Sequence, residues 1–307
     1  MNDSSNVAPA TSAAQHIDGR GLSAAICAFL IWGLMPLYMK LLQTLPILQI
    51  TAHRMLWGCL VGFGWLAARK ETNQTWRALT DPQVRLRLCA SAIFIACNWT
   101  IFMWGIATDH VVEISLGYFI GPLFNVALGV VCFRERLNRM QWLSVAIAAA
   151  GVLYLTWAAG RPPYISIALA LSFGLYGLVR KTANVEALPG FTGETLLLVP
   201  FAAAYVLWCE LSGTGAIGQG SLGTALLLLL GGPLTAVPLV LFAVGARRIP
   251  LFTVGILQYI GPSLQLACAV LVFGESFSGP RVIGFSMIWT ALALFALDGL
   301  LASRRRS

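Results

Sequence analysis

The chain has 307 residues, of which 58% are hydrophobic and only 10% charged, with a formal net charge of +8. A soluble domain carries about a quarter charged residues, so the composition excludes a soluble globular protein and predicts one that crosses the bilayer repeatedly. The basic residues form short clusters between apolar runs, which is typical of cytoplasmic loops. We therefore expect no nucleic-acid binding.

Residues 1–20 are polar and lack the basic segment and short apolar core of a cleaved signal peptide. We expect a disordered cytoplasmic tail there. Ten apolar runs follow, each close to the roughly 20 residues that a bilayer requires. The expected spans are 22–40, 47–67, 88–107, 112–133, 141–159, 164–180, 192–210, 222–245, 252–273 and 282–302. We expect the segment 69–87 to be a polar, basic loop, and Pro46 and Pro189 to stand just before the second and seventh helices.

One apolar stretch is written twice. Residues 119–135 read FIGPLFNVALGVVCFRE and residues 259–275 read YIGPSLQLACAVLVFGE, at a constant offset of 140. This match predicts two five-helix repeats, 21–160 and 161–303. Because five is odd, the second repeat enters the bilayer from the opposite side. We therefore predict an all-α polytopic membrane protein of ten transmembrane helices in two inverted five-helix repeats, an architecture typical of secondary transporters.

Orientation follows from the distribution of positive charge. Sixteen of the 20 Lys and Arg residues fall on the side that carries both termini, whereas Lys40, Arg161 and Arg281 fall on the other. The positive-inside rule then predicts a multi-pass protein with both termini in the cytoplasm.

The duplicated helices carry polar side chains at matching positions. Tyr118 and Asn125 are seven residues apart and share a helix face, and Gln258 and Gln265 are their counterparts in the second repeat. Polar groups are expensive in lipid, so both pairs are expected to face the bundle interior. They are candidate walls of a substrate cavity, and interhelical hydrogen bonding is the alternative role.

Several ionisable residues lie within or beside the spans. His53 and Arg54 lie about eight residues into the second span, roughly 12 Å deep. Arg54 is expected to find an interior partner or to extend outwards. Glu194 is the counterpart of His53, and Glu113 is a candidate partner of Arg54. Glu113 and Glu194 are candidate proton-coupling or gating residues, with structural roles as the alternative.

Aromatic and amide side chains within the spans suit an amphipathic solute, although packing or interfacial positions are the commoner role of such aromatics. Together with the residues above, the expected cavity set contains Trp32, Asn98, Trp99, Trp104, Tyr176 and Tyr259. Pro233 and Pro238 are expected to break the eighth span. The sequence has no P-loop, HExxH or GxSxG motif, and its three histidines are widely separated. We predict no enzyme activity, no cofactor and no metal site.

Four stretches carry a family resemblance. They are AHRMLWG at 52–58, NWTIFMWGIATDHVVEISLGYFIGPL at 98–123, ALSFGLYGLVRK at 170–181 and LQYIGPSLQ at 257–265. They resemble the RarD proteins of the EamA branch of the drug/metabolite transporter superfamily. The resemblance implies a ten-helix permease of a bacterial inner membrane, associated with chloramphenicol sensitivity or resistance. Members usually carry Asn where this chain has Gly121, so chloramphenicol itself is not implied as the solute.

These observations predict a secondary transporter that moves a small organic solute or drug by alternating access, with the lipid bilayer as its surroundings. The resemblance favours export. Protons as the coupling ion are a secondary hypothesis. The alternative is a membrane-embedded ligand sensor or accessory scaffold that does not transport, and an intramembrane enzyme is less favoured. Substrate, direction, stoichiometry and oligomeric state are left open.

Overall fold

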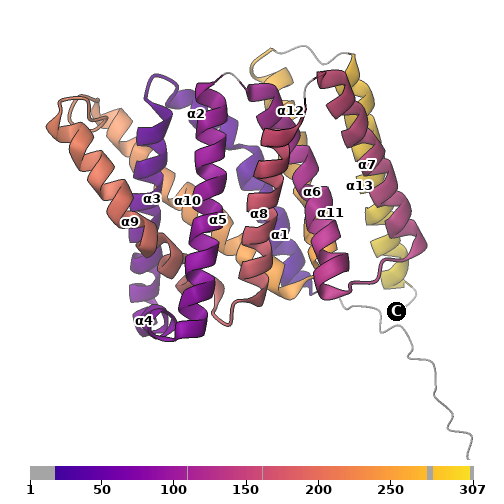
Figure 1. The fold of residues 1–307 in the computed structure, drawn as a ribbon, viewed down its shortest axis with the longest axis horizontal. Coiled ribbons are helices and arrows are strands. Elements are labelled where there is room, and N and C mark those ends of the chain that lie inside the picture. Colours follow the sequence, from indigo (N-terminus) through magenta and orange to yellow (C-terminus); the bar gives the residue numbers. More distant parts are fainter. Residues whose placement is uncertain (1–17, 109, 161, 275–278, 305–307) are drawn as a thin grey trace, which may run out of the picture.

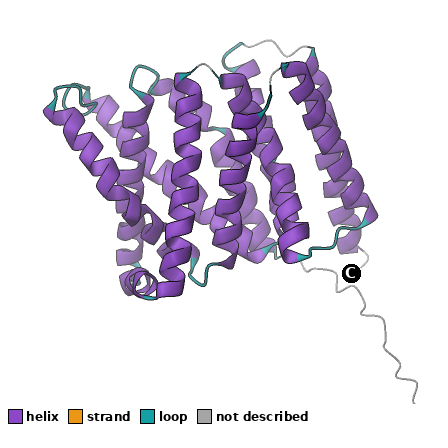
Figure 2. Cartoon of the chain, in the orientation of Figure 1, coloured by secondary structure: helices purple, strands orange, loops and turns teal. Residues whose placement is uncertain are grey.

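The computed structural model describes residues 18–108, 110–160, 162–274 and 279–304, and these residues form α-helices and no strands (Figure 2). The helices are α1 (Gly19–Gly33), α2 (Met35–Leu41), α3 (Ile47–Ala68), α4 (Thr72–Thr80), α5 (Pro82–Ala107), α6 (Val111–Phe133), α7 (Arg139–Ala159), α8 (Tyr164–Thr182), α9 (Ala187–Leu211), α10 (Leu222–Arg248), α11 (Leu251–Gln258), α12 (Ile260–Leu271) and α13 (Pro280–Arg304). The expected tail lies almost wholly outside the described residues.

Nine spans among the described residues are long and apolar enough to cross a membrane, with α1–α2 and α11–α12 each counted as one. Helix α3 is the tenth long helix, with 22 residues, and His53 and Arg54 lower its hydropathy. The all-α polytopic fold is therefore confirmed.

Helix boundaries differ from expectation at two places. The expected loop 69–87 contains the short helix α4 and the first turn of α5. In α4, Thr75 and Ala78 are buried while Trp76 is exposed, so this helix lies along the surface of the bundle. Pro189 lies in the first turn of α9 and not before it. Proline is tolerated there because a first-turn N–H has no partner within the helix.

The prolines do not interrupt the helices where the sequence suggested. The expectation that Pro233 and Pro238 break the eighth span was wrong, because α10 runs through both. Each proline removes one N–H donor, and packing against neighbouring helices keeps such a helix intact. The interruptions occur instead at Leu34, between α1 and α2, and at Tyr259, between α11 and α12. Each lies a few residues before a proline.

The long helices run up and down across one layered bundle (Figure 1). Corresponding helices of the two halves contact each other, namely α3 with α9, α6 with α11 and α7 with α13. The contact of α1 with α10 is likewise matched by that of α8 with α5. The packing agrees with two related five-helix halves, and the boundaries 21–160 and 161–303 stay a prediction.

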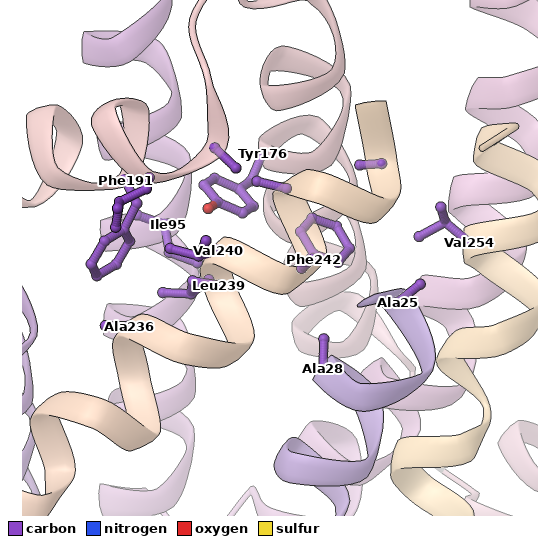
Figure 3. Close-up of a cluster of buried hydrophobic side chains, with 14 of the residues drawn as sticks. Ala25, Ala28, Ile95, Tyr176, Phe191, Ala236, Leu239, Val240, Phe242 and Val254 are labelled. Atoms are coloured by element: carbon purple, nitrogen blue, oxygen red, sulfur yellow. The ribbon is translucent and has the colours of Figure 1, made fainter. Parts of the chain in front are cut away.

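The largest buried cluster lies where α1, α5, α8, α9 and α10 meet (Figure 3). Small residues allow close helix approach there. A Cβ on Gly245 of α10 would come within 2.9 Å of the Ala25 side chain of α1. Tyr176 and Phe242 are fully buried and stack, with ring centroids 6.0 Å apart. This cluster fills the middle of the bundle with side chains.

We call the side of the bundle that carries the start of α1, α4 and the end of α13 the terminal face, and the other side the far face (Figure 1). Because spans alternate in direction, the start of α3 and the end of α5 belong to the far face. The start of α9 and the start of α11 belong to the terminal face.

Candidate substrate-binding site

A small cavity opens between α2, α3 and α5 in the far-face half. Its volume is about 30 Å³, and its lining residues are Met39, Ile47, Thr51, Arg54, Trp99 and Phe102. Arg54 and Trp99 were expected in a cavity wall, and the other four were not identified from the sequence. The one feature that these four residues share in the sequence is their position, because each lies in the part of its helix nearest the far face.

Arg54 is anchored from one side. Its Nε donates a hydrogen bond to Thr235 Oγ1 of α10 at 3.0 Å, and Thr235 Oγ1 donates in turn to the Gly231 carbonyl at 2.7 Å. Among the residues that the structure describes, Arg54 forms no ion pair with Glu113 or any other acid. The suggested Arg54–Glu113 pair is therefore not formed.

The two polar pairs predicted on the duplicated helices, Tyr118 with Asn125 and Gln258 with Gln265, meet at one contact. Asn125 Nδ2 donates to Gln258 Oε1 at 2.7 Å, and Asn125 is fully buried. A Cβ on Gly121 would lie 3.1 Å from Gln258 Nε2, so this glycine faces the same contact. The pair links α6 to α11, which is the structural role considered for these residues.

Tyr118 and Gln265, the other members of these pairs, and the neighbouring Tyr259 make different contacts. Tyr118 is 39% exposed and packs edge-on against Phe102 beside the cavity. Gln265 Nε2 donates to the Trp32 carbonyl at 3.4 Å. Tyr259 is buried, and its hydroxyl donates to the Phe119 carbonyl, the residue that the sequence repeat aligns with it.

Glu194 lies at the centre of a buried polar cluster in the terminal-face half. Ser91 Oγ and the Tyr176 hydroxyl donate to its carboxylate at 2.7 and 3.0 Å. Arg180 Nη1 lies 3.7 Å from Glu194 Oε2, and Arg180 Nη2 donates to the Ala187 carbonyl. Arg180 and Glu194 are 0% and 1% exposed. The carboxylate is thus compensated within the bundle.

The remaining predicted residues divide between packing and the far-face surface. Trp32 packs against Phe173 and Phe242 in the central cluster. Asn98 Nδ2 donates to the Leu169 carbonyl and to Ser172 Oγ, which joins α5 to α8. These contacts leave both residues in helix packing and away from the cavity.

His53 and Trp104 do not line the cavity either. His53 is buried against Trp57, with the rings stacked 6.5 Å apart, and its Nδ1 has no hydrogen-bond partner within the described residues. Trp104 is half exposed and stacks on His110. Glu113 is buried, and its backbone carbonyl accepts a hydrogen bond from Ser166 Oγ.

A clamp that the sequence reasoning did not identify joins the halves at the terminal face. The Glu135 carboxylate accepts hydrogen bonds from the amides of Leu251 and Phe252 at 2.7 and 2.9 Å, at the start of α11. Lys181 Nζ lies 3.7 Å from Glu135 and donates to the Ile249 carbonyl at 2.7 Å. The helix dipole also stabilises a carboxylate at a helix N-terminus. We call these contacts the terminal clamp.

Part of the clamp recurs at the far face. Lys181 Nζ lies 5.1 Å from the centroid of the Phe133 ring, and Lys40 Nζ lies 4.3 Å from that of Phe273. Phe273 follows Phe133 by 140 residues and Lys181 follows Lys40 by 141. The repeated FxE sequence, at 133–135 and 273–275, could therefore have indicated the clamp. Glu275 itself lies outside the described residues.

Comparisons with known proteins agree with this architecture. Residues 19–157 match the EamA-like transporter family. An uncharacterized transporter of Pseudomonas aeruginosa is 43% identical over 93% of this chain and 96% of its own length. Protein RarD of Escherichia coli is 40% identical over 94% of this chain and 97% of its own length. The chain belongs to the EamA-like transporter family.

Within that family it is a RarD-type protein, as its full-length similarity shows. A further relative from Pseudomonas aeruginosa, named chloramphenicol-sensitive protein RarD, is 31% identical over 95% of this chain and 98% of its own. A crystal structure that covers 94% of this chain and 99% of its own superposes with a TM-score of 0.68 at 20% identity. That last likeness shows the shared fold.

Proposed function

We propose that this RarD-type protein is a secondary transporter that exports a small organic solute from the bacterial cytoplasm by alternating access. The inverted arrangement of two five-helix halves supports this, because such repeats interconvert between two oppositely facing states. The positive-inside rule supports a cytoplasmic terminal face, and in the proposal the protein lies in the inner membrane. Arg180, one of the sixteen basic residues assigned to that side, is buried within the bundle, and the remaining charge bias still has the same sign.

The difference between the two ends of the bundle carries the proposal. At the terminal face, Glu135 and Lys181 hold the start of α11 against the first half. In the far-face half, a cavity reaches Arg54 in the middle third of α3. The terminal face carries a wider, open depression of about 390 Å³ that is lined by Glu135, Lys181 and Arg247. The clamp beneath it, and not the size of the two hollows, supports an outward-facing state in which the cytoplasmic side is closed.

The solute is a small organic molecule whose identity requires direct measurement. One relative is named for chloramphenicol, which makes that drug a test compound. In this chain Gly121 stands beside Gln258 where the family resemblance implies an asparagine. The chain therefore differs from the family pattern at this helix contact, and chloramphenicol is not the solute that we propose.

Protons are the coupling ion in the proposal, and Glu194 is the candidate carrier. Its carboxylate contacts α5 and α8, so a change in its protonation would alter contacts between three helices. Glu113 is the second candidate, near the far face. Both assignments predict that transport collapses when the proton gradient across the membrane is removed.

Counterflow in proteoliposomes is the test. Protein reconstituted with a high internal concentration of a solute should drive transient uptake of the labelled solute, and Glu135→Gln should change the rate. Specific binding without counterflow would contradict the proposal and favour a membrane-embedded sensor. If counterflow occurs and solute accumulation is the same with and without a proton gradient, the protein is a transporter and proton coupling is refuted.

A further inference from the structure

Arg54 is a charged side chain within a membrane span, and no acid among the described residues forms an ion pair with it. The ion pairs among the described residues all join other groups. A charge at this depth is costly unless it is paired. By contrast, Arg180, which is fully buried, has Glu194 as its partner.

The geometry of Arg54 leaves the binding end of its side chain available. Thr235 accepts from Nε, and neither Nη group forms a hydrogen bond with a described residue. A guanidinium presents paired N–H donors that match the two oxygens of a carboxylate, or two oxygens of a phosphate. The Thr235 contact fixes the guanidinium, so less side-chain entropy is lost when an oxyanion binds.

The cavity at Arg54 has room for a small polar head group. It measures about 30 Å³, whereas a site for one water needs roughly 10–15 Å³. Its other walls are mainly apolar and aromatic, with Trp99, Phe102 and Met39 beside the arginine. A ligand that fits this combination joins a compact oxyanion to an apolar body that contacts the aromatic side chains.

We propose that the solute of this transporter is an amphipathic organic anion whose oxyanion head group binds Arg54. This inference rests on the proposed transport function and names its substrate class. The planar shape and small size of a carboxylate suit the cavity, and a phosphate ester is the other source of the same chemistry. The neutral counterpart of such an acid loses the charge-assisted hydrogen bonds and is bound weakly.

Thermal-shift measurements on the purified full-length protein test the proposal. The probes are phenylacetate, hydrocinnamate and indoleacetate, each beside its primary amide, with phenyl phosphate as the phosphate arm. At least one acid should raise the melting temperature and bind at least about tenfold more tightly than its amide, the ratio expected when a hydrogen bond to a charged group is lost. A stronger shift with phenyl phosphate would assign the head group to phosphate esters.

Two variants at Arg54 and one matched control complete the test. Arg54→Gln should abolish the preference for acids. Arg54→Lys should weaken it, because an ammonium lacks the paired N–H donors of a guanidinium. Without ligand, Arg54→Gln should melt higher than the wild type, because an unmatched charge is removed from the membrane. Arg87→Gln removes the same charge at the start of α5, where Arg87 bonds the Thr182 carbonyl, and should leave the preference intact.

The outcomes separate this inference from the transport proposal. Equal binding of acids and amides, no binding of any acid, or unchanged selectivity in Arg54→Gln would each overturn the anion assignment. Counterflow of a neutral solute would then still support transport. Acid binding that depends on Arg54, but without counterflow, would support the site and refute transport.

Discussion

At the scale of single residues, the buried ion pair Arg180–Glu194 is the strongest local constraint in the terminal-face half. Both side chains are almost fully buried, and Ser91 and Tyr176 complete the coordination of the carboxylate. Such a pair adds little stability relative to apolar side chains of the same volume. Removal of one member leaves a buried charge without compensation.

We therefore expect Glu194→Gln to lower the free energy of unfolding by about 3–5 kcal/mol. The double variant Glu194→Gln with Arg180→Met should recover most of this loss, because it removes the stranded guanidinium. Denaturation in detergent, followed by circular dichroism, measures both. If the double variant were less stable than the single one, the charge argument would be wrong.

The Asn125–Gln258 contact is weaker by the same reasoning. Asn125→Ala leaves the Gln258 carbonyl oxygen without its donor, and interhelical hydrogen bonds in membranes average about 0.6 kcal/mol. We expect a stability loss of that order and a small fall in melting temperature. A loss of solute binding with unchanged stability would instead return Asn125 to the cavity wall.

At the scale of helices, the terminal clamp ties α11 to the end of α6 and to α8. Its carboxylate satisfies two amides at the start of α11 that have no partner within the helix. Under the proposed alternating access, opening of this face would require Glu135 to release them. In that proposal the strength of the clamp sets the balance between the two faces.

Glu135→Gln should accordingly increase exposure of the terminal-face half. In a background without the seven native cysteines, a cysteine placed at the buried Val254 should react faster with a water-soluble maleimide when Glu135 is neutralised. Glu71→Gln is the matched control, because Glu71 pairs with Arg69 on the same face at an exposed site. Equal labelling rates in all three proteins would contradict the gating role.

A second element-level contact links the start of α1 to the end of α10. Asp18 accepts a hydrogen bond from Arg248 at 2.9 Å and caps α1 through the Arg20 amide. The Arg248 hydrogen bond, followed by that amide, lowers the pKa of Asp18 below its ordinary value of 3.8. The lowered pKa means that the folded state favours the carboxylate, so this contribution is present above that ordinary value and is lost as the pH falls through the folded pKa.

We expect the melting temperature of the wild type to fall more than that of Asp18→Asn as the pH is lowered below about 4. The difference should be small and should shrink at high salt, because both partners are exposed. Parallel pH profiles for the two proteins would show that the contact does not contribute.

At the scale of the whole molecule, topology decides which face meets the cytoplasm. Fusion of green fluorescent protein to the C-terminus should give fluorescent cells, and fusion of alkaline phosphatase there should be inactive, since the positive charge lies on that side. Phosphatase fused after Gly160, beyond α7, should be active. The reverse pattern would invert the orientation. The clamped terminal face would then lie outside the cell, and the structure would be closed on that side.

The sequence by itself determined the class of protein, and it predicted ten spans in an inverted duplication. Apolar run length, the constant offset of 140 and an odd number of spans per half are properties of the chain order alone. Four short stretches of specific sequence carried the family resemblance, which the full-length relatives confirm. Short or surface elements such as α4 were missed because their hydrophobic pattern is too brief to register.

Only the tertiary structure decided which polar groups meet. Spacing placed Asn125 and Gln258 on helix faces, but their mutual hydrogen bond depends on how α6 and α11 rotate and tilt against each other. The same holds for Glu194, which met Arg180, and for Arg54, which met Thr235 and no described acid. Helix rotation is set by side-chain packing across many contacts, and that information is not local to any stretch of the sequence.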